Sequence, residues 1–272
     1  MNKKWSIDGF TLKMIAVITM LVDHTGATIF ERMLNGINQE GLYFGFWSEH
    51  YYWLVWIYVA MRAIGRIAFP IYCFLIVEGL SHTRNVWKYA MRLGVFALIS
   101  EIPFDLAFNR TLNSGCLVEF KYNNVFLTLF VGLVTIALMK CAGEWIINRM
   151  ENGKAWVQVA VLLVQLVILA LGMLLAELGL HTDYGASGVA TIGAIYLLYD
   201  KPWKKVWLAQ LAGVVTLTLL AGELEAVALV TVPLIARYNG QRGRQLKYFF
   251  YGFYPVHLLL LELACIVLGI GA

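Results

Sequence analysis

Charged residues are scarce in this sequence. They make up 14% of its 272 residues, whereas 60% are hydrophobic, and a soluble domain usually carries about 25% charged residues. A water-soluble fold of this length cannot hide so much apolar surface, because a single core stops growing near this size. The net charge of +4 is small, and short basic clusters between apolar runs are not the stripe typical of a nucleic-acid-binding protein. We therefore expect a lipid bilayer, and no nucleic acid, as a partner.

No cysteine pair and no cleavage pattern stands out in the sequence. None of the four cysteines forms a C-x-x-C pair, and three lie in or beside apolar runs, which favours buried thiols over a disulfide framework or a zinc site. We predict buried thiols and no metal site; the residues are Cys73, Cys116, Cys141 and Cys265. The first apolar run is long and ends in Asp23 and His24 without small residues suited to cleavage. We interpret it as a membrane helix and not as a signal peptide.

Long apolar runs fill the rest of the sequence and predict an all-α bundle that crosses the membrane many times. Because a crossing helix needs about 20 apolar residues, about nine segments qualify, and they are 10–30, 53–80, 88–108, 124–147, 155–178, 184–200, 204–221, 223–237 and 247–270. The second is so long that it is tilted, or residues 51–61 form an aromatic belt at the interface. The eighth is short. With no internal repeat or soluble segment, we expect residues 1–272 to form a single integral membrane domain.

Basic residues alternate between the loops on the two sides of this predicted bundle. One side holds Lys3, Lys4, Arg84, Lys88, Arg92, Lys140, Arg149, Lys154, Lys201, Lys204, Lys205, Arg237, Arg242, Arg244 and Lys247. The other side holds Arg32, Arg110 and Lys121. Cytoplasmic loops carry the excess of Lys and Arg. We therefore predict a multi-pass protein of the cell membrane with its N-terminus in the cytoplasm and its C-terminus outside.

Ionisable residues within the predicted spans are the main functional signal. Each costs at least ~2.5 kcal/mol at the centre of a bilayer, so such residues face a bundle interior, a water-filled cavity or the interface. They include Lys13, Asp23, His24, Arg62, Arg66, Glu78, Glu101, Asp105, His257 and Glu262.

The first span carries three of these residues. The spacing between Lys13 and His24 is close to a whole number of helical turns. The two side chains therefore lie on nearly the same helix face, roughly 16 Å apart along the axis. His24 can serve as a general base, because imidazole changes protonation near neutral pH, or it is a structural histidine at the interface. Asp23 lies about 100° round the helix from His24, where it can pair with an arginine of another helix.

Two arginines at i and i+4, Arg62 and Arg66, share one helix face, and their like charges repel unless anions compensate them. They form either a clamp for a phosphate or carboxylate, or a structural pair that is balanced by Asp23, Glu78, Glu101 or Asp105.

Later spans add two carboxylates and a histidine. Glu101 and Asp105 are also at i and i+4, and Pro103 between them is expected to kink or end the third span. These carboxylates are counter-ions, part of a proton path, or partners of the arginines. His257 lies near the middle of the last span, where it either belongs to a site or satisfies a backbone carbonyl that Pro255 leaves free.

The most specific sequence blocks resemble the TraX family. LKMIAVITMLVDHTGA (12–27) is similar to the opening helix of that family, and RAIGRIAFPIYCFLIVEGLSHT (62–83) to its second block. SEIPFDL (100–106), DYG (183–185) and FYPVHLL (253–259) extend the resemblance over nearly the whole chain. The resemblance implies an integral membrane protein and a link to N-terminal acetylation of conjugative pilin.

A more distant resemblance is to multispanning membrane acyltransferases that use acyl-coenzyme A. Many of them carry an arginine, ten residues and a histidine in the first helix; Lys13 and His24 stand at these positions here. Their second arginine pair often has two intervening residues, whereas Arg62 and Arg66 have three. The resemblance implies that Lys13 lies near the donor phosphates and that His24 is the catalytic base or acyl carrier. Arg62 and Arg66 would hold the acceptor or stabilise an oxyanion.

Together, the intramembrane residues and the resemblance predict an acetyltransferase with acetyl-CoA as co-substrate. We expect His24 and Asp23 to be catalytic. Lys13, Arg62, Arg66, Glu101, Asp105 and His257 are predicted to bind the substrates. The acceptor is a peptide, a glycan or a small amine. The alternatives are a proton-coupled transporter or permease, and a non-catalytic membrane partner of a secretion or conjugation apparatus.

Overall fold

The computed structural model describes residues 6–109, 118–119, 121–150, 155–199 and 205–270, and within these ranges every regular element is a helix. The all-α prediction is therefore confirmed for the described chain. Several residues that the orientation and cysteine predictions used lie outside the described ranges, namely Lys3, Lys4, Arg110, Cys116, Lys154, Lys201 and Lys204.

The described helices mark a membrane protein. Five helical segments are long and apolar enough to cross a bilayer, and they are Gly9–Gln39, Tyr51–His82, Val125–Arg149, Ala155–Gly179 and Tyr248–Val267. Two shorter apolar helices follow the fourth segment, α10 (Gly185–Tyr199) and α11 (Val206–Ala221). The short predicted span 223–237 folds as a 3₁₀ segment, η4 (Glu223–Val230), and a short helix, α12 (Thr231–Ala236). About nine crossings and the orientation of the chain remain predictions.

The chain divides into two compact units. The first comprises the described parts of residues 1–71, 99–119 and 227–272, and the second those of 72–98 and 120–226. The single membrane domain expected for residues 1–272 stays a prediction.

The first unit begins with a long helix in three parts. α1 (Gly9–Thr25) starts at Asp8, whose side chain caps it by accepting a hydrogen bond from the backbone N–H of Thr11. It continues as a π-helical segment, η1 (Gly26–Phe30), and as α2 (Glu31–Glu40). Gly41 ends α2 in the left-handed conformation that glycine adopts without steric cost. The helix therefore runs well past residue 30, the predicted end of the first span.

The second long segment consists of two helices. After α3 (Phe46–Glu49), α4 (Tyr51–Gly65) packs along α1, and a break at Arg66 and Ile67 separates it from α5 (Ala68–His82). Leu54 of α4 is fully buried, whereas Trp53 and Trp56 are exposed. This break explains how so long an apolar run, 53–80, fits the fold.

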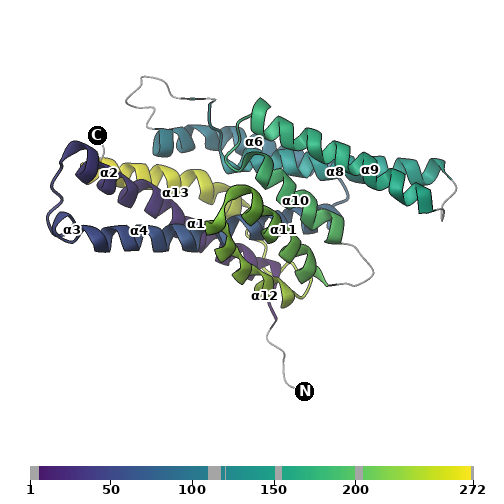
Figure 1. Cartoon of the computed structure of the whole chain (residues 1–272), viewed down its shortest axis with the longest axis horizontal. Coiled ribbons are helices and arrows are strands. Elements are labelled where there is room, and N and C mark those ends of the chain that lie inside the picture. The colour runs from purple at the N-terminus through teal and green to yellow at the C-terminus, as the bar shows by residue number, and fades with distance from the viewer. Residues whose placement is uncertain (1–5, 110–117, 120, 151–154, 200–204, 271–272) are drawn as a thin grey trace, which may run out of the picture. The chain divides into compact units, whose positions relative to one another are not determined.

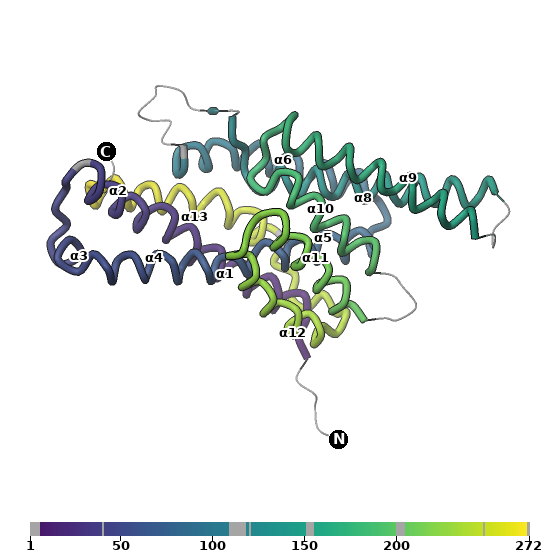
Figure 2. Tube along the Cα trace, in the orientation of Figure 1, coloured from purple at the N-terminus to yellow at the C-terminus, as the bar shows by residue number. Residues whose placement is uncertain are grey.

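The last helix returns to the first. α13 (Lys247–Val267) packs against α1 and η1, as Figure 2 shows. It also contacts a second π-helical segment, η2 (Asp105–Asn109), which continues α6 (Val86–Phe104). The α-helix passes through Pro103 and ends one residue after it, where the π-helical segment begins.

The second unit is built on closely approaching helices. α8 (Val125–Arg149), α9 (Ala155–Leu174) and α10 pack against one another, and α11 packs on α10 (Figure 1). The side chain of Asn124 begins α8 by accepting a hydrogen bond from the backbone N–H of Phe126. A π-helical segment, η3 (Leu175–Gly179), ends α9. Glycines in these helices touch side chains of their neighbours, as small residues at membrane helix interfaces do; the pairs are Gly132 with Ile192, Gly193 with Leu169, and Gly213 with Ile195.

Candidate functional site

Two histidines from opposite ends of the sequence meet in the first unit. Nδ1 of His24 in α1 lies 2.6 Å from Nε2 of His257 in α13, within hydrogen-bonding distance. The ring planes are within 4° of parallel and the ring centroids are 4.9 Å apart. Since a face-to-face stack separates atoms by about 3.5 Å or more, the short N–N distance means that the rings meet edge to edge. A hydrogen bond therefore joins two nearly coplanar imidazoles.

Aromatic side chains surround this pair. Phe108 of η2 and Tyr254 of α13 approach His24 edge-on, with centroid distances of 5.4 and 5.7 Å. The ring of Phe253 stacks on His257 at 4.7 Å. His257 is 4% exposed. Both imidazoles are thus held in an apolar setting, in which a hydrogen bond is stronger than in water.

His257 also binds its own helix. Its Nδ1 lies 2.7 Å from the carbonyl oxygen of Phe253, one helical turn earlier. Proline has no backbone N–H, so Pro255 cannot donate to a different carbonyl, that of Tyr251 four residues before it. The interpretation that His257 satisfies the carbonyl freed by Pro255 is therefore wrong, since the ring bonds to the carbonyl oxygen of Phe253.

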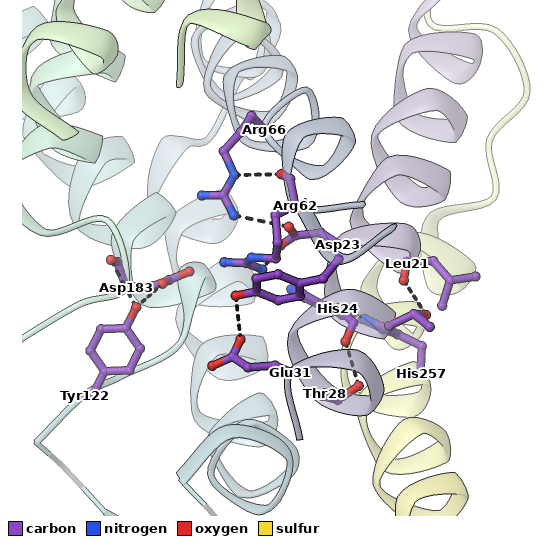
Figure 3. A network of polar contacts seen from close by, with 12 residues as sticks. Leu21, Asp23, His24, Thr28, Glu31, Arg62, Arg66, Tyr122, Asp183 and His257 are labelled. Carbon is purple, nitrogen blue, oxygen red and sulfur yellow. Dashed lines mark hydrogen bonds and ion pairs between the residues drawn. The ribbon is translucent and has the colours of Figure 1, made fainter. Parts of the chain in front are cut away.

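Arg62 of α4 and Arg66, which directly follows α4, converge on Asp23, as Figure 3 shows. Nη1 of Arg62 lies 2.8 Å from Oδ2 of Asp23, and Nη2 of Arg66 lies 3.1 Å from Oδ1. The Nε–H of Arg66 also donates to the carbonyl oxygen of Arg62, at 3.1 Å. Among the carboxylates that the sequence offered as partners, Asp23 thus supplies one oxygen to each arginine. The three side chains carry a net positive charge.

The local fold explains why these charges meet. Asp23 and His24 are consecutive, so α1 presents the carboxylate to α4 and the imidazole to α13 (Figure 3). Gly65 of α4 faces Asp23 of α1, and the absence of a Cβ at Gly65 makes room for the carboxylate. Nearby on α4, the hydroxyl of Tyr58 donates to Glu31 at 3.1 Å.

A buried ion pair, which was not predicted from the sequence, lies further along the long helix that begins with α1. Arg32 of α2 is 5% exposed, and its Nη2 lies 2.6 Å from Glu262 of α13 and 2.6 Å from the carbonyl oxygen of Ala107 in η2. The sequence placed Arg32 in an outer loop, because polar residues follow the apolar run of α1. The π-helical η1 instead continues the helix and carries Arg32 inward. Glu262, an acidic residue within an apolar run, was the available signal.

The remaining predicted residues lie at separate positions of the fold. Nζ of Lys13 lies 5.5 Å from the ring centroid of Phe250, nearer the start of α1 than His24. Asp105 is fully buried, and its Oδ2 accepts a hydrogen bond from the backbone N–H of Glu119 at 2.7 Å. Glu101 is buried in α6. Their predicted roles toward a substrate stay predictions.

In chemical terms, the site combines a proton-exchanging group with cationic donors. A histidine can accept and return a proton, and the two guanidinium groups beside it present N–H donors to an anion or a developing oxyanion. α1 holds the two sets together, since it carries His24 itself and, one residue earlier, the Asp23 that binds both arginines.

Comparisons with known proteins place these residues in a family. The family model described as "TraX protein" matches residues 8–265 of this chain. A curated relative is the "Probable fimbrial assembly protein FimC, serogroup H1" of Dichelobacter nodosus, which is 29% identical over 96% of this chain and 97% of its own length. No solved structure matches the chain. Because the family model covers nearly all of the sequence, including His24 and His257, the chain belongs to the TraX protein family.

Proposed function

We propose that this protein is an acetyltransferase of the cytoplasmic membrane. It transfers the acetyl group of acetyl-CoA to an amine or hydroxyl acceptor, and the acceptor we favour is the N-terminus of a pilin-like or fimbrial subunit. The observation that carries the proposal is the hydrogen-bonded pair of His24 and His257 beside the arginines bound to Asp23. The name of the D. nodosus relative supports the choice of a fimbrial acceptor.

The reaction that we propose begins with His24 as a general base. Its free ring nitrogen removes a proton from the acceptor amine or hydroxyl as that group attacks the thioester carbonyl carbon. The new C–N or C–O bond forms, the C–S bond breaks, and His24 returns the proton to the leaving thiolate of coenzyme A. No further reactant is needed, because the proton that His24 removes from the acceptor ends on the thiol of coenzyme A.

The cationic residues supply the electrostatic part of the proposal. Arg62 and Arg66 stabilise the negative charge that develops on the carbonyl oxygen, and Asp23 fixes their positions. Lys13 lies on α1 toward the predicted cytoplasmic end and attracts the phosphates of the donor. Neither role requires a metal ion.

The first experiment is acetyl-CoA binding and acetyl transfer with detergent-purified protein. Calorimetry measures the affinity, and radiolabelled acetyl-CoA with a peptide that copies a pilin N-terminus measures transfer. We expect saturable binding and a loss of transfer of at least about 100-fold in His24→Ala. The matched control is His50→Ala, which removes an exposed histidine outside the site. Folded protein that does not bind acetyl-CoA, or a fully active His24→Ala, would falsify the proposal.

A proton-coupled transporter is the second candidate, and the buried pair of Arg32 and Glu262 within apolar segments favours it. Reconstitution into vesicles distinguishes the two candidates. A transporter takes up its substrate in response to an imposed proton gradient, whereas an acetyltransferase forms acetylated product and free coenzyme A without a gradient.

A further inference from the structure

The hydrogen bonds around His257 fix where its proton lies. The carbonyl oxygen of Phe253 can only accept, so Nδ1 of His257, at 2.7 Å, is the donor and carries a hydrogen. In a neutral imidazole one nitrogen is a donor and the other an acceptor. Nε2 of neutral His257 therefore presents a lone pair, and this is the atom that faces His24.

The same logic then fixes the proton of His24. Nδ1 of His24 lies 2.6 Å from Nε2 of His257, which presents a lone pair, so Nδ1 must donate and carry the hydrogen. Nε2 of neutral His24 is consequently unprotonated. Free histidine in water prefers the opposite tautomer, with the hydrogen on Nε2, so the arrangement imposes a tautomer that the side chain would not choose alone.

The geometry points to His257 as a positioning residue that locks His24 in the Nδ1-protonated tautomer and thereby makes Nε2 of His24 the proton-accepting atom. The catalytic consequence rests on the proposed function, whereas the tautomer does not. The role is new for His257, which the sequence placed among the substrate-binding residues.

Neighbouring aromatic rings hold His257 in the orientation that this role needs. Phe253 stacks on one face of the imidazole with the planes 14° apart, and Tyr254 approaches it edge-on at 5.7 Å. The carbonyl oxygen of Phe253 fixes the rotation of the ring about its side-chain bonds. One segment of α13 thus supplies the acceptor, the stacking partner and the histidine.

The orienting group of this site is a neutral side chain. An aspartate fulfils the corresponding role in serine-protease triads, whereas here the neighbouring carboxylate, Asp23, binds Arg62 and Arg66 instead. His257 orients the base without a permanent charge. When His24 takes up a proton, its bond to His257 becomes charge-assisted and therefore stronger.

The direct test is the protonation state of each ring nitrogen, read by ¹⁵N NMR of protein labelled in its five histidine rings. His24→Gln and His257→Gln assign the two sets of signals. We expect both rings to show a protonated Nδ1 and an unprotonated Nε2, and His257→Phe to shift His24 toward the Nε2-protonated form. A wild-type His24 that carries its hydrogen on Nε2 overturns the inference, and so does a His24 spectrum unchanged by His257→Phe.

The kinetic test separates positioning from mere packing. His257→Phe should lower kcat by about 100-fold and leave KM within about twofold. His257→Gln should recover much of this loss, because its amide oxygen accepts from His24 and its NH₂ group donates to Phe253. Full kcat in His257→Phe overturns the positioning role. If the tautomer is observed but wild-type protein transfers no acetyl group, the proposed function fails while the structural inference stands.

Discussion

Gly65 of α4 packs directly against the carboxylate of Asp23 in α1. A Cβ added to Gly65 would overlap the Asp23 side chain. The close approach of two backbones, which small residues permit between membrane helices, is therefore what brings Arg62 and Arg66 to the same carboxylate.

We predict that Gly65→Ala disrupts this contact. The added methyl group must displace Asp23 or separate α1 from α4, which should lower the thermal unfolding temperature in detergent and reduce acetyl transfer at least about tenfold. The matched control is Gly252→Ala in α13, where an added Cβ meets no atom within 4 Å. Equal stability and activity of the two variants would show that the Asp23 contact is not tight in the working protein.

Arg32 and Glu262 should behave as a coupled pair. Because Arg32 is buried, Glu262→Gln leaves its charge without a counter-ion and should destabilise the protein by about 3 kcal/mol. Replacing both residues with methionine should recover most of that loss, since an apolar pair has no buried charge to compensate. A double-mutant cycle on unfolding in detergent measures the coupling. Strictly additive effects would mean that the two side chains do not interact.

The exposed aromatic residues around α3 should mark the membrane–water interface. Trp and Tyr gather at this depth in membrane proteins, and here Tyr43, Tyr52, Trp53 and Trp56 are all strongly exposed. We predict that a nitroxide at Trp53→Cys is reached by both oxygen and a water-soluble nickel complex. Leu163→Cys near the middle of α9, similarly exposed, should be reached by oxygen alone. Identical accessibility at both positions would contradict the assignment. The prediction of buried thiols is confirmed for Cys73 and Cys265 and wrong for Cys141, which is exposed; a background free of native cysteines avoids unwanted labelling.

The cap of α1 should be sensitive to acid. The backbone N–H and then the hydroxyl of Thr11 donate to Asp8 and lower the pKa of that carboxyl. A lowered pKa means that the stabilisation is present above the unfolded-state pKa, about 4, and is lost as the pH falls through the folded-state value.

We expect Asp8→Ala to cost about 1 kcal/mol at pH 7 and less below pH ~3. Asp8→Asn keeps a side-chain oxygen for the cap without a titrating group, so its stability should not share this dependence on pH. Thermal unfolding of the three proteins at several pH values measures the difference. A gap between wild type and Asp8→Ala that stays constant into acid would contradict the expectation.

The sequence predicts which residues belong to the candidate site better than it predicts which of them contact one another. Apolar runs predict helices because burial in lipid requires them. An ionisable residue within such a run is easily recognised as a candidate site residue. The pairing of His24 with His257 spans 233 positions, and no periodicity connects residues that far apart. Similarly, charge balance allowed four carboxylates as partners of the arginines, and only the packing of α1 on α4 selects Asp23. Helical continuity failed as a guide at Arg32, because polarity after an apolar run indicates a loop as readily as an inward-facing helix.

The π-helical η1 separates the histidine pair from the arginine–glutamate pair on one helix. A π-helical turn holds one more residue than the α-helical frame around it requires. Deleting one residue, for example Ala27, would therefore let a regular α-helix form. The side chains after the deletion would keep nearly their present direction relative to His24, because the residue removed is the one that the α-helical frame does not need, and Arg32 would still face Glu262. In this sense η1 works as a phase adjuster: a single deletion within its five residues should be tolerated far better than a deletion in the regular α-helix on either side, which turns every later side chain by about 100°.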